Sequence, residues 1–241
     1  MKLTVLNSGS KGNGYVIEND SEALIIEAGV RLSKAKEALD FNISKVQGCI
    51  VSHSHQDHAK YIKEYADAGI TVMGPGELFK TAHSGYRDLT HGKGYKAGGF
   101  KVIPFKVVHD VPCFGYLIDH EETGRILFLT DTAYTEYKVP ELRHMLIEAN
   151  YADDILEKSI EKGKTHPVMK RRLMTTHMEF QTTKRLIKAN DISKVNNIVL
   201  IHLSDSHSDE NRFVREIIEL TSKNVFCARK GLIVELNNEP F

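Results

Sequence analysis

The sequence predicts an α/β protein with much antiparallel sheet, folded as a single domain over residues 1–241. Short apolar runs alternate with glycine-rich turns in the first third, and stretches with helical spacing follow several of these runs. No linker, repeat or low-complexity tract divides the chain. A content of 41% hydrophobic and 27% charged residues suits one conventional buried core.

The first half of the chain is expected to begin as an antiparallel meander. Strands are predicted at residues 3–6, 15–18 and 23–26, a helix at 33–39, a buried strand at 48–51, a helix at 59–68 and a strand at 71–73. The stretch from there to residue 99 contains many glycines and lysines and is expected to be less regular.

The second half is expected to contain strands, then helices, then a mixed end. Strands are predicted at residues 100–108, 115–119 and 125–130, and mostly helical structure at 141–188, with Pro167 as a break or first-turn residue. The end is predicted as strand, helix, strand and strand at residues 197–201, 211–221, 225–228 and 232–236. A duplicated sheet-and-helix architecture accounts for this order.

Charge and cysteine content narrow the function classes. Lys plus Arg and Asp plus Glu number 32 each, so net charge favours neither a nucleic-acid nor a membrane partner. The widely spaced Cys49, Cys113 and Cys227 favour small buried thiols over a disulfide framework or a thiolate metal site. The first residues form no apolar run long enough for a signal peptide or a membrane span, so a cytoplasmic location is expected.

Four potential metal ligands follow the predicted strand at 48–51 within six positions: His53, His55, Asp57 and His58. Residues two apart in an extended segment point the same way, so His53 and His55 can hold one ion. The turn into the next helix can direct Asp57 and His58 toward a second ion. A polar loop with surface histidines is the alternative, but this spacing favours metal. Such donors suit zinc, manganese or iron(II), and the number of histidines favours zinc.

Three further residues follow predicted strands and can complete two metal sites. They are His109, Asp131 and His202. A lone polar residue after a strand is usually a turn or cap residue, but three of them in a chain with an HxHxDH segment indicate ligands.

The order of these segments resembles the metallo-β-lactamase superfamily over nearly the whole chain. The motifs are residues 25–29 (IIEAG), 53–58 (HSHQDH), His109, 129–132 (LTDT) and 201–204 (IHLS). The resemblance implies a four-layer αββα sandwich with two metals at one end of the sheets. It also implies two ligand sets and a bridge: His53, His55 and His109 for the first ion, Asp57, His58 and His202 for the second, and Asp131 between them.

Closer features are similar to the YycJ/WalJ-type exonuclease branch, which is akin to phosphodiesterases. They are residues 9–14 (GSKGNG), the stretch from His109 to residue 116, residues 148–151 (EANY) and the His177 segment. Residues 111–114 (VPCF) depart from the small and acidic residues common there. Glu27 stands where the family usually has Asp. It is expected to orient the site from outside the ligand set, although a plain strand-end acid would also explain it.

The resemblance implies a metal-dependent hydrolase, specifically a phosphodiesterase or nuclease, with an exonuclease as the narrower expectation. Two divalent ions would activate a water for attack on phosphorus. Asp57 and Asp131 would hold the ions in place, and His177 is the candidate acid for the leaving group. A helix-surface histidine is the alternative for His177.

Substrate contacts are expected from two segments. Ser10 and Asn13 lie in the first glycine-rich turn, although a tight hairpin turn also explains its glycines. Lys170, Arg171 and Arg172 form a basic cluster, with Lys164 nearby, that can bind phosphates of DNA or RNA; a solvated helix face is the alternative. The remaining histidines are expected to be solvated: His83, His91, His120, His144, His166 and His207.

Two rival functions stay open. A small-molecule hydrolase acting on a cyclic or alkyl phosphodiester, a thioester or a lactone would use the same metals, because only the pocket separates these chemistries. A silent binding protein with a structural metal is the second rival, although a structural site is usually closed by four ligands and more donors are present here. Lactam hydrolysis is disfavoured by the absence of a leader and by Asp57 and His58. The sequence does not predict the oligomeric state.

Overall fold

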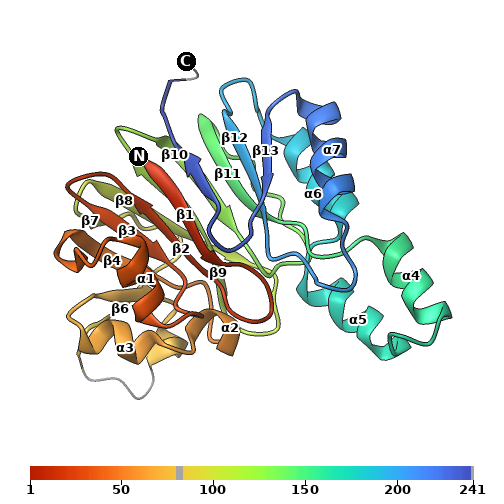
Figure 1. The fold of residues 1–241 in the computed structure, drawn as a ribbon, viewed down its shortest axis with the longest axis horizontal. Helices are drawn as coiled ribbons and strands as arrows, with labels where there is room; N and C mark the ends of the chain where they lie inside the picture. The colour runs from red at the N-terminus through yellow and green to blue at the C-terminus, as the bar shows by residue number, and fades with distance from the viewer. Residues whose placement is uncertain (80–83, 240–241) are drawn as a thin grey trace.

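The computed structural model describes residues 1–79 and 84–239 and contains two seven-stranded mixed sheets packed face to face (Figure 1). The strands of the first sheet are, in spatial order, β14 (Ile233–Glu235), β1 (Lys2–Asn7), β2 (Gly14–Glu18), β3 (Ala23–Ile26), β4 (Val46–Ile50), β5 (Val72–Gly74) and β6 (Tyr86–Asp88). Those of the second sheet are β13 (Asn224–Cys227), β12 (Asn197–Ile201), β11 (Leu142–Glu148), β10 (Gly124–Leu129), β9 (Cys113–His120), β8 (Phe100–Val107) and β7 (Tyr95–Ala97).

Both sheets combine an antiparallel part with a parallel part. In the first sheet β1, β2 and β3 pair antiparallel, as the predicted meander requires, and β3 to β6 then run parallel. In the second sheet β7 to β10 pair antiparallel and β10 to β13 run parallel. The two sheets therefore repeat one arrangement.

Helices cover the outer face of each sheet. On the first sheet lie α1 (Leu32–Ala38) and α3 (Ile62–Asp67), which follows the short α2 (Gln56–Ala59). On the second sheet lie α6 (Phe180–Ala189) and α7 (Glu210–Thr221). The layers run helix, sheet, sheet, helix, which confirms the predicted αββα sandwich (Figure 1). Two short 3₁₀ turns lie at Ile43–Lys45 and Gly76–Phe79.

The interior strands read as continuous apolar runs because both of their faces are covered. In β2, Tyr15 and Ile17 join the core between the sheets, whereas Val16 points to the core under α1 and α3. β3 divides in the same way, with Leu24 and Ile26 between the sheets. The alternation of a strand thus places one set of side chains in each of two cores.

The prediction of mostly helical structure at residues 141–188 is wrong for β11, which occupies Leu142–Glu148. Its sequence, LRHMLIE, contains several good helix formers, so local preference favours a helix. Both edges of the segment instead pair in parallel with β10 and β12, and its apolar side chains are buried. Tertiary pairing overrides local preference here.

The helix predicted at residues 59–68 is divided into α2 and α3. The division falls at Tyr61, whose backbone N–H donates to the Ala28 carbonyl at 2.9 Å instead of continuing the helix. In the stretch expected to be irregular, β6 and β7 add short edge strands. Pro167 is the first residue of α5, as predicted.

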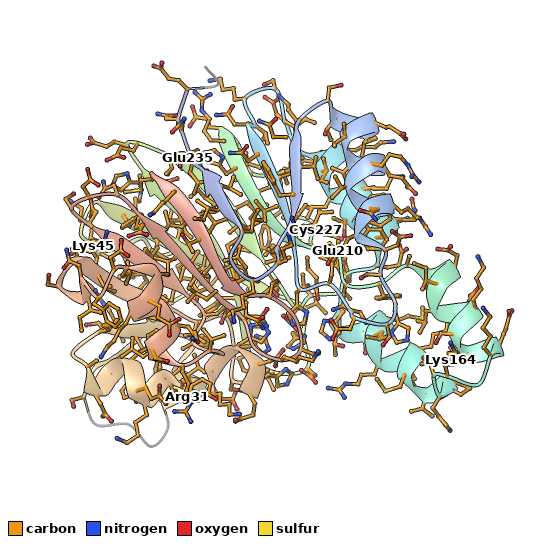
Figure 2. All side chains as sticks on the ribbon, viewed as in Figure 1. Arg31, Lys45, Lys164, Glu210, Cys227 and Glu235 are labelled. Atoms are coloured by element: carbon orange, nitrogen blue, oxygen red, sulfur yellow. The ribbon has the colours of Figure 1, made fainter. Side chains whose placement is uncertain are left out.

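Helices α4 (Asp153–Glu161) and α5 (Pro167–Thr176) form a pair that projects beyond the sandwich (Figure 1). Tyr151, Leu156 and Leu173 form a small apolar cluster between them. Lys164 lies in the loop at the far tip of the pair (Figure 2). The other end of α5 returns to the strand ends of the second sheet at His177.

Cys49 and Cys113 are buried free thiols, as predicted, and Cys227 is half-buried. Cys227, the last residue of β13, lies beside Glu210 at the start of α7 (Figure 2), and burial raises the pKa of its thiol to about 12. The helices within residues 1–79 and 84–239 are all too short or too polar to span a lipid bilayer.

Candidate metal centre

The candidate ligands converge because they follow strands whose carboxyl ends meet at one end of the sandwich. In the first sheet Glu27 follows β3 and the HSHQDH segment follows β4, and these strands run parallel. In the second sheet Asp131 follows β10 and His202 follows β12. The strand between them, β11, is parallel to both and ends at Glu148. Topology therefore assembles the centre from segments far apart in the chain.

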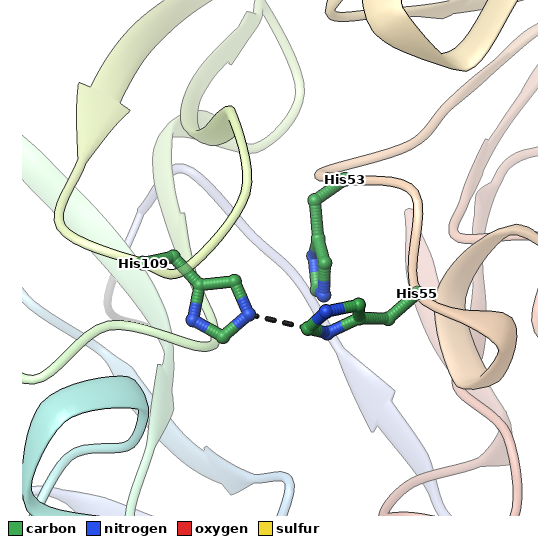
Figure 3. A group of neighbouring side chains, drawn as sticks. All are labelled: His53, His55 and His109. Carbon is green, nitrogen blue, oxygen red and sulfur yellow. Dashed lines mark hydrogen bonds between the residues drawn. The ribbon is translucent and has the colours of Figure 1, made fainter. Parts of the chain in front are cut away.

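One group of donors consists of His53, His55 and His109, whose rings turn toward one another from the two sheets (Figure 3). One donor atom from each residue lies within 4.8 Å of the others. The Nε2 atom of His109 is 3.3 Å from Nδ1 of His55, and its Nδ1 is 3.1 Å from the Thr176 carbonyl oxygen, to which it can donate. This contact aims Nε2 of His109 into the group.

A second group consists of Asp57, His58 and His202, again with donor atoms within 4.8 Å of one another. Asp57 Oδ2 lies 3.1 Å from His202 Nε2 and 3.3 Å from His58 Nε2. Asp131 lies beside both groups: with His53 and His58 it forms a third set of neighbouring donors, and its Oδ2 is 3.1 Å from His58 Nε2. The residues of the two predicted sets thus lie together, with Asp131 beside both, and their roles as ligands stay a prediction.

The donor set fits divalent cations. His53 is fully buried, and its Nδ1 is 2.9 Å from Ser52 Oγ, while its Nε2 has no hydrogen-bond partner among the described residues. Burial and the neighbouring His58 lower the pKa of His53, so its ring is neutral and keeps a lone pair. A buried polar atom without a partner is rare, and a metal bond would satisfy it.

The carboxylates of the candidate centre also stabilise positive charge on the groups beside them. Burial alone would lower the pKa of His58, but Asp131 and Glu27 outweigh burial and raise that pKa well above its usual value. Burial alone would also lower the pKa of His202. Asp131 and Asp57 outweigh burial and raise that pKa to about 10. A divalent cation would supply the positive charge that these carboxylates attract.

Glu27 lies directly behind the HSHQDH segment. Both of its carboxylate oxygens are 3.3 Å from the Ser52 N–H, and Oε1 is 3.4 Å from His58 Nδ1. By holding Nδ1 of His58, Glu27 leaves Nε2 facing Asp57 and Asp131. This is the outer position expected for it from the sequence, occupied by a longer carboxylate than the family's Asp.

His177 lies at the edge of the centre and is paired with Glu148. Its Nδ1 is 2.7 Å from Glu148 Oε1 and 3.4 Å from Asp131 Oδ1, and its ring stacks on His202 with centroids 5.3 Å apart. Burial alone would lower the pKa of His177, but Glu148 and Asp131 outweigh burial and raise that pKa. With Nδ1 paired in this way, Nε2 is the nitrogen left for proton transfer.

Glu148 is a residue whose individual role the sequence did not indicate. Its fully buried carboxylate accepts hydrogen bonds from the backbone of Thr132 at 3.2 Å and Met178 at 3.1 Å, and it lies 3.3 Å from His202 Nδ1. It therefore connects the candidate acid His177, a candidate ligand and two backbone segments. The only local signal for this role was that Glu148 is an acidic residue at the end of β11, in the EANY segment that also contains Asn150.

The predicted substrate contacts occupy different environments. Ser10 is exposed in the glycine-rich turn, whereas Asn13 is buried; its side chain accepts from the Gly9 N–H at 2.8 Å and lies 3.2 Å from the Asp57 carbonyl. Asn13 thus ties the turn to the HSHQDH segment.

The predicted basic cluster lies on α5. Lys170 pairs with Glu157 at 2.8 Å, while Arg171 and Arg172 are exposed and form no ion pair with any described residue. The structure places this cluster on α5, the helix that is followed directly by His177.

The expectation of solvated histidines is wrong for His120, His144 and His207, which are buried. Each has a polar partner that the sequence could not show: Glu22 for His120 at 3.0 Å, Asn197 for His144 at 3.1 Å and Thr165 for His207 at 2.8 Å. His91 and His166 are exposed, as expected, and His83 lies outside the described residues.

Three residues of the centre have a left-handed backbone: Glu27 with φ of 67°, Asp131 with 48° and His202 with 53°. Non-glycine residues rarely adopt this conformation, and in proteins it concentrates at functional sites. Each of the three directly follows a strand or begins a turn, so the unusual backbone redirects its side chain into the centre.

The family model of the metallo-beta-lactamase superfamily matches residues 8–160. The matched region holds the glycine-rich turn, the HSHQDH segment, His109, Asp131 and Glu148. The chain therefore belongs to the metallo-beta-lactamase superfamily.

The chain is similar in sequence to a protein named as a nuclease and similar in fold to one named as a diphosphatase. Exodeoxyribonuclease YycJ of Bacillus anthracis is 26% identical over 147 residues, which are 56% of this chain and 55% of that protein. The match thus spans little more than half of the curated relative. The metallo-beta-lactamase fold protein YhfI from Bacillus subtilis has a TM-score of 0.73 at 19% identity, over 97% of this chain and 99% of the other. A diphosphatase of the PhnP family has a TM-score of 0.63 at 16% identity, over 97% of both chains.

Proposed function

We propose that this protein is a metal-dependent phosphodiesterase that acts on nucleic acid, with an exonuclease as the narrower assignment. The observation that carries the proposal is the pair of donor groups with Asp131 beside both, which would hold two neighbouring divalent ions. The similarity to a protein named an exodeoxyribonuclease supports nucleic acid as the substrate. Residues 1–241 would act as one domain, because both sheets contribute to one shared core.

The ligand roles follow the two groups. His53, His55 and His109 would hold one ion, and Asp57, His58 and His202 the other, with Asp131 between them. Ions held there would acidify a water for attack on phosphorus and offset charge on the phosphate oxygens. Zinc suits the many imidazole donors, and manganese or iron(II) would accept the same set.

The residues around the ligands prepare the centre for this chemistry. Glu27 lies 3.4 Å from His58 Nδ1 and Glu148 lies 3.3 Å from His202 Nδ1, so Nε2 of each ring would be the nitrogen that faces an ion. His177, held by Glu148 through Nδ1, would donate a proton from Nε2 to the leaving alkoxide. Ser10 and Asn13 on one side, and Lys170, Arg171 and Arg172 on the other, would contact the substrate.

A small-molecule hydrolase is the second candidate, acting on a cyclic or alkyl phosphodiester, a thioester or a lactone. The similarity in fold to a diphosphatase is the observation that favours it. The same ligands would serve both functions, so the surroundings of the centre must separate them. Two buried free thiols, Cys49 and Cys113, suit a reducing compartment and support a cytoplasmic location for either enzyme.

The first experiment compares a small diester with DNA. Metal-free protein is refilled separately with zinc, manganese and iron(II), and hydrolysis of bis(p-nitrophenyl) phosphate and of 5′-labelled single-stranded DNA is followed, with Asp131→Ala as control. Cleavage of DNA that is lost in the control is expected. Cleavage of the small ester alone would favour the second candidate, and cleavage of neither would contradict a phosphodiesterase.

A further inference from the structure

Exposed apolar side chains occur on three separate segments that each contribute a residue to the candidate metal centre. Val108, which directly precedes His109, is 48% exposed; Tyr134, three residues after Asp131, is 50% exposed; Met174, three residues before His177, is 53% exposed. The three segments meet at the centre, since His109 contacts the Thr176 carbonyl and His177 contacts Asp131. Large apolar groups gathered at one place on a surface indicate a binding site.

The backbone of Tyr134 is fixed relative to the centre. The Thr132 hydroxyl donates to the Tyr134 carbonyl at 2.8 Å, and the Thr132 N–H donates to Glu148, which also holds His177. The ring of Tyr134 makes no aromatic contact with any described residue, whereas Tyr137 nearby packs against Phe105. Tyr134 is therefore an anchored residue with an aromatic face available to a ligand.

Helix α5 adds positive charge to the same surface. Arg171 and Met174 are three residues apart and so share one face of the helix, which ends at His177. The exposed guanidinium groups of Arg171 and Arg172 pair with no described carboxylate. Six residues of helical rise place Arg171 about 9 Å along the axis from His177. An exposed apolar side chain and exposed cationic side chains therefore lie on the helix that leads to His177.

We propose that Tyr134, Met174 and Val108 form a nucleobase-binding rim, which receives an unpaired base next to the phosphate at the metal centre, while Arg171 binds a neighbouring phosphate. This inference rests on the proposed nuclease function and names its substrate as single-stranded nucleic acid. Aromatic stacking with a cationic groove is how proteins bind single strands without sequence preference. Bases inside a duplex are stacked on one another and have no free face for Tyr134.

The apolar residues 111–114 fit the same occupant. In this loop, between β8 and β9, Val111 is half-buried and Pro112 is exposed. The acidic side chain of this loop, Asp110, is directed at the donor group, with Oδ1 3.1 Å from His109 Nε2 and 3.3 Å from His55 Nε2. Residues 111–114 themselves carry no charge and leave an apolar neighbour for a base. The departure from the family pattern seen in the sequence thus has a physical use.

The test compares an intact single strand with one that lacks the bases of its terminal nucleotides, using the metal-loaded full chain. In the parent protein kcat/KM is expected to be about tenfold or more higher for the intact strand, since base stacking on an aromatic ring has this strength. In Tyr134→Ala and Met174→Ala the ratio of the two kcat/KM values should fall toward one, and Tyr134→Phe should restore it. Phe41→Ala, which removes a still more exposed aromatic after α1, should keep the parental ratio.

Each other outcome overturns a defined part of the scheme. If the parent protein cleaves both strands with nearly equal kcat/KM, the proposed nucleobase-binding rim is wrong and the nuclease proposal is unaffected. Cleavage of bis(p-nitrophenyl) phosphate without cleavage of either strand would overturn the nuclease proposal itself. An unchanged ratio in both variants, with a lower molar mass of Met174→Ala in solution, would assign the surface to contact between copies of this chain.

Discussion

The two halves of the candidate metal centre are built in different ways. The first sheet supplies a compact half, in which His53, His55, Asp57 and His58 follow one strand within six residues. The second sheet supplies a dispersed half, in which the three ligand candidates each follow a different strand: His109, Asp131 and His202. Local structure shapes the compact half, whereas only the packing of the sandwich assembles the dispersed half.

Short-range contacts explain the geometry of the compact half. His55 begins the short helix α2, and its carbonyl accepts from the N–H groups of His58 and Ala59. The Asp57 carbonyl accepts from the Asn13 N–H at 2.7 Å, next to Gly29. The turn that separates the two pairs of donors is thus fixed by immediate neighbours. Substitutions in this half should damage the local fold, and those in the other half should damage chemistry.

The largest effect is expected for Asp131→Ala in the dispersed half. Asp131 Oδ2 lies 3.1 Å from His58 Nε2 of the second donor set, and Asp131 also groups with His53 of the first, so its loss removes the carboxylate that lies beside both sets. Activity should fall by roughly 10³-fold or more, the scale of removing a main electrostatic element of a catalytic site. Steady-state kinetics and metal analysis by mass spectrometry check this. His55→Ala, which removes one donor from one set, should fall less; an equal or greater loss would contradict a shared role for Asp131.

The next effect is on stability and concerns Gly29→Ala in the compact half. A Cβ at Gly29 would overlap the Asp57 carbonyl and crowd the Asn13 N–H. Both are backbone groups that cannot turn away, so we expect a loss of about 3 kcal/mol in the free energy of unfolding, at the upper end of overpacking effects. Urea unfolding of the metal-free protein measures it.

A matched control separates this clash from a general cost of removing glycine. Gly69 has a left-handed φ of 82° but no atom within 4 Å of an added Cβ. Gly69→Ala should therefore cost only about 1 kcal/mol, the cost of a left-handed L-residue. If both variants lose the same amount, the close approach at Gly29 is not what shapes the compact half.

His177→Ala should show a substrate-dependent loss of activity. An alkoxide leaving group needs a proton, whereas p-nitrophenolate leaves readily without one. Cleavage of DNA should therefore fall by about 100-fold, within the usual range for a general acid, with a clearly smaller fall for bis(p-nitrophenyl) phosphate. Glu148→Gln should give the same pattern in weaker form, because it loosens His177 without removing it. Equal losses on both substrates would argue for a structural role of His177.

The smallest expected effect is on stability and concerns His144, a buried histidine that is not a ligand candidate. Burial lowers the pKa of His144 from 6.5 to about 4. The folded state thus binds fewer protons than the unfolded state between these values, so stability present above pH 6.5 is lost as the pH falls toward 4. Between pH 7 and pH 5.5 this amounts to about 1 kcal/mol. His144→Gln should remove this part of the pH dependence of urea unfolding; an unchanged dependence would contradict the buried neutral state.

The same contrast explains what the sequence could predict. The compact half was predictable because its donors are adjacent, and β2 and β3 were predictable because two covered faces give apolar runs. The position of Pro167 followed from its fixed backbone angle and missing N–H. In each case the cause of the structure lies within a few residues.

The features missed by sequence analysis have causes that are distant in the chain. β11 is a strand because β10 and β12 flank it, against the preference of its own residues. The predicted helix is interrupted where the Tyr61 N–H donates to the Ala28 carbonyl. Glu148 is connected to the centre through its contact with His177, which lies 29 residues further along the chain. Such partners are fixed by topology, which came from family resemblance and not from periodicity.

The left-handed backbones of Glu27, Asp131 and His202 affect how this chain can change over generations. At each of these positions glycine would relieve strain of about 1 kcal/mol while removing a carboxylate or imidazole from the centre. Loss of activity at these positions is therefore partly offset by a gain in stability. A descendant no longer selected for catalysis would keep its sandwich and accumulate glycine at these positions first, so glycine there would mark an inactive copy.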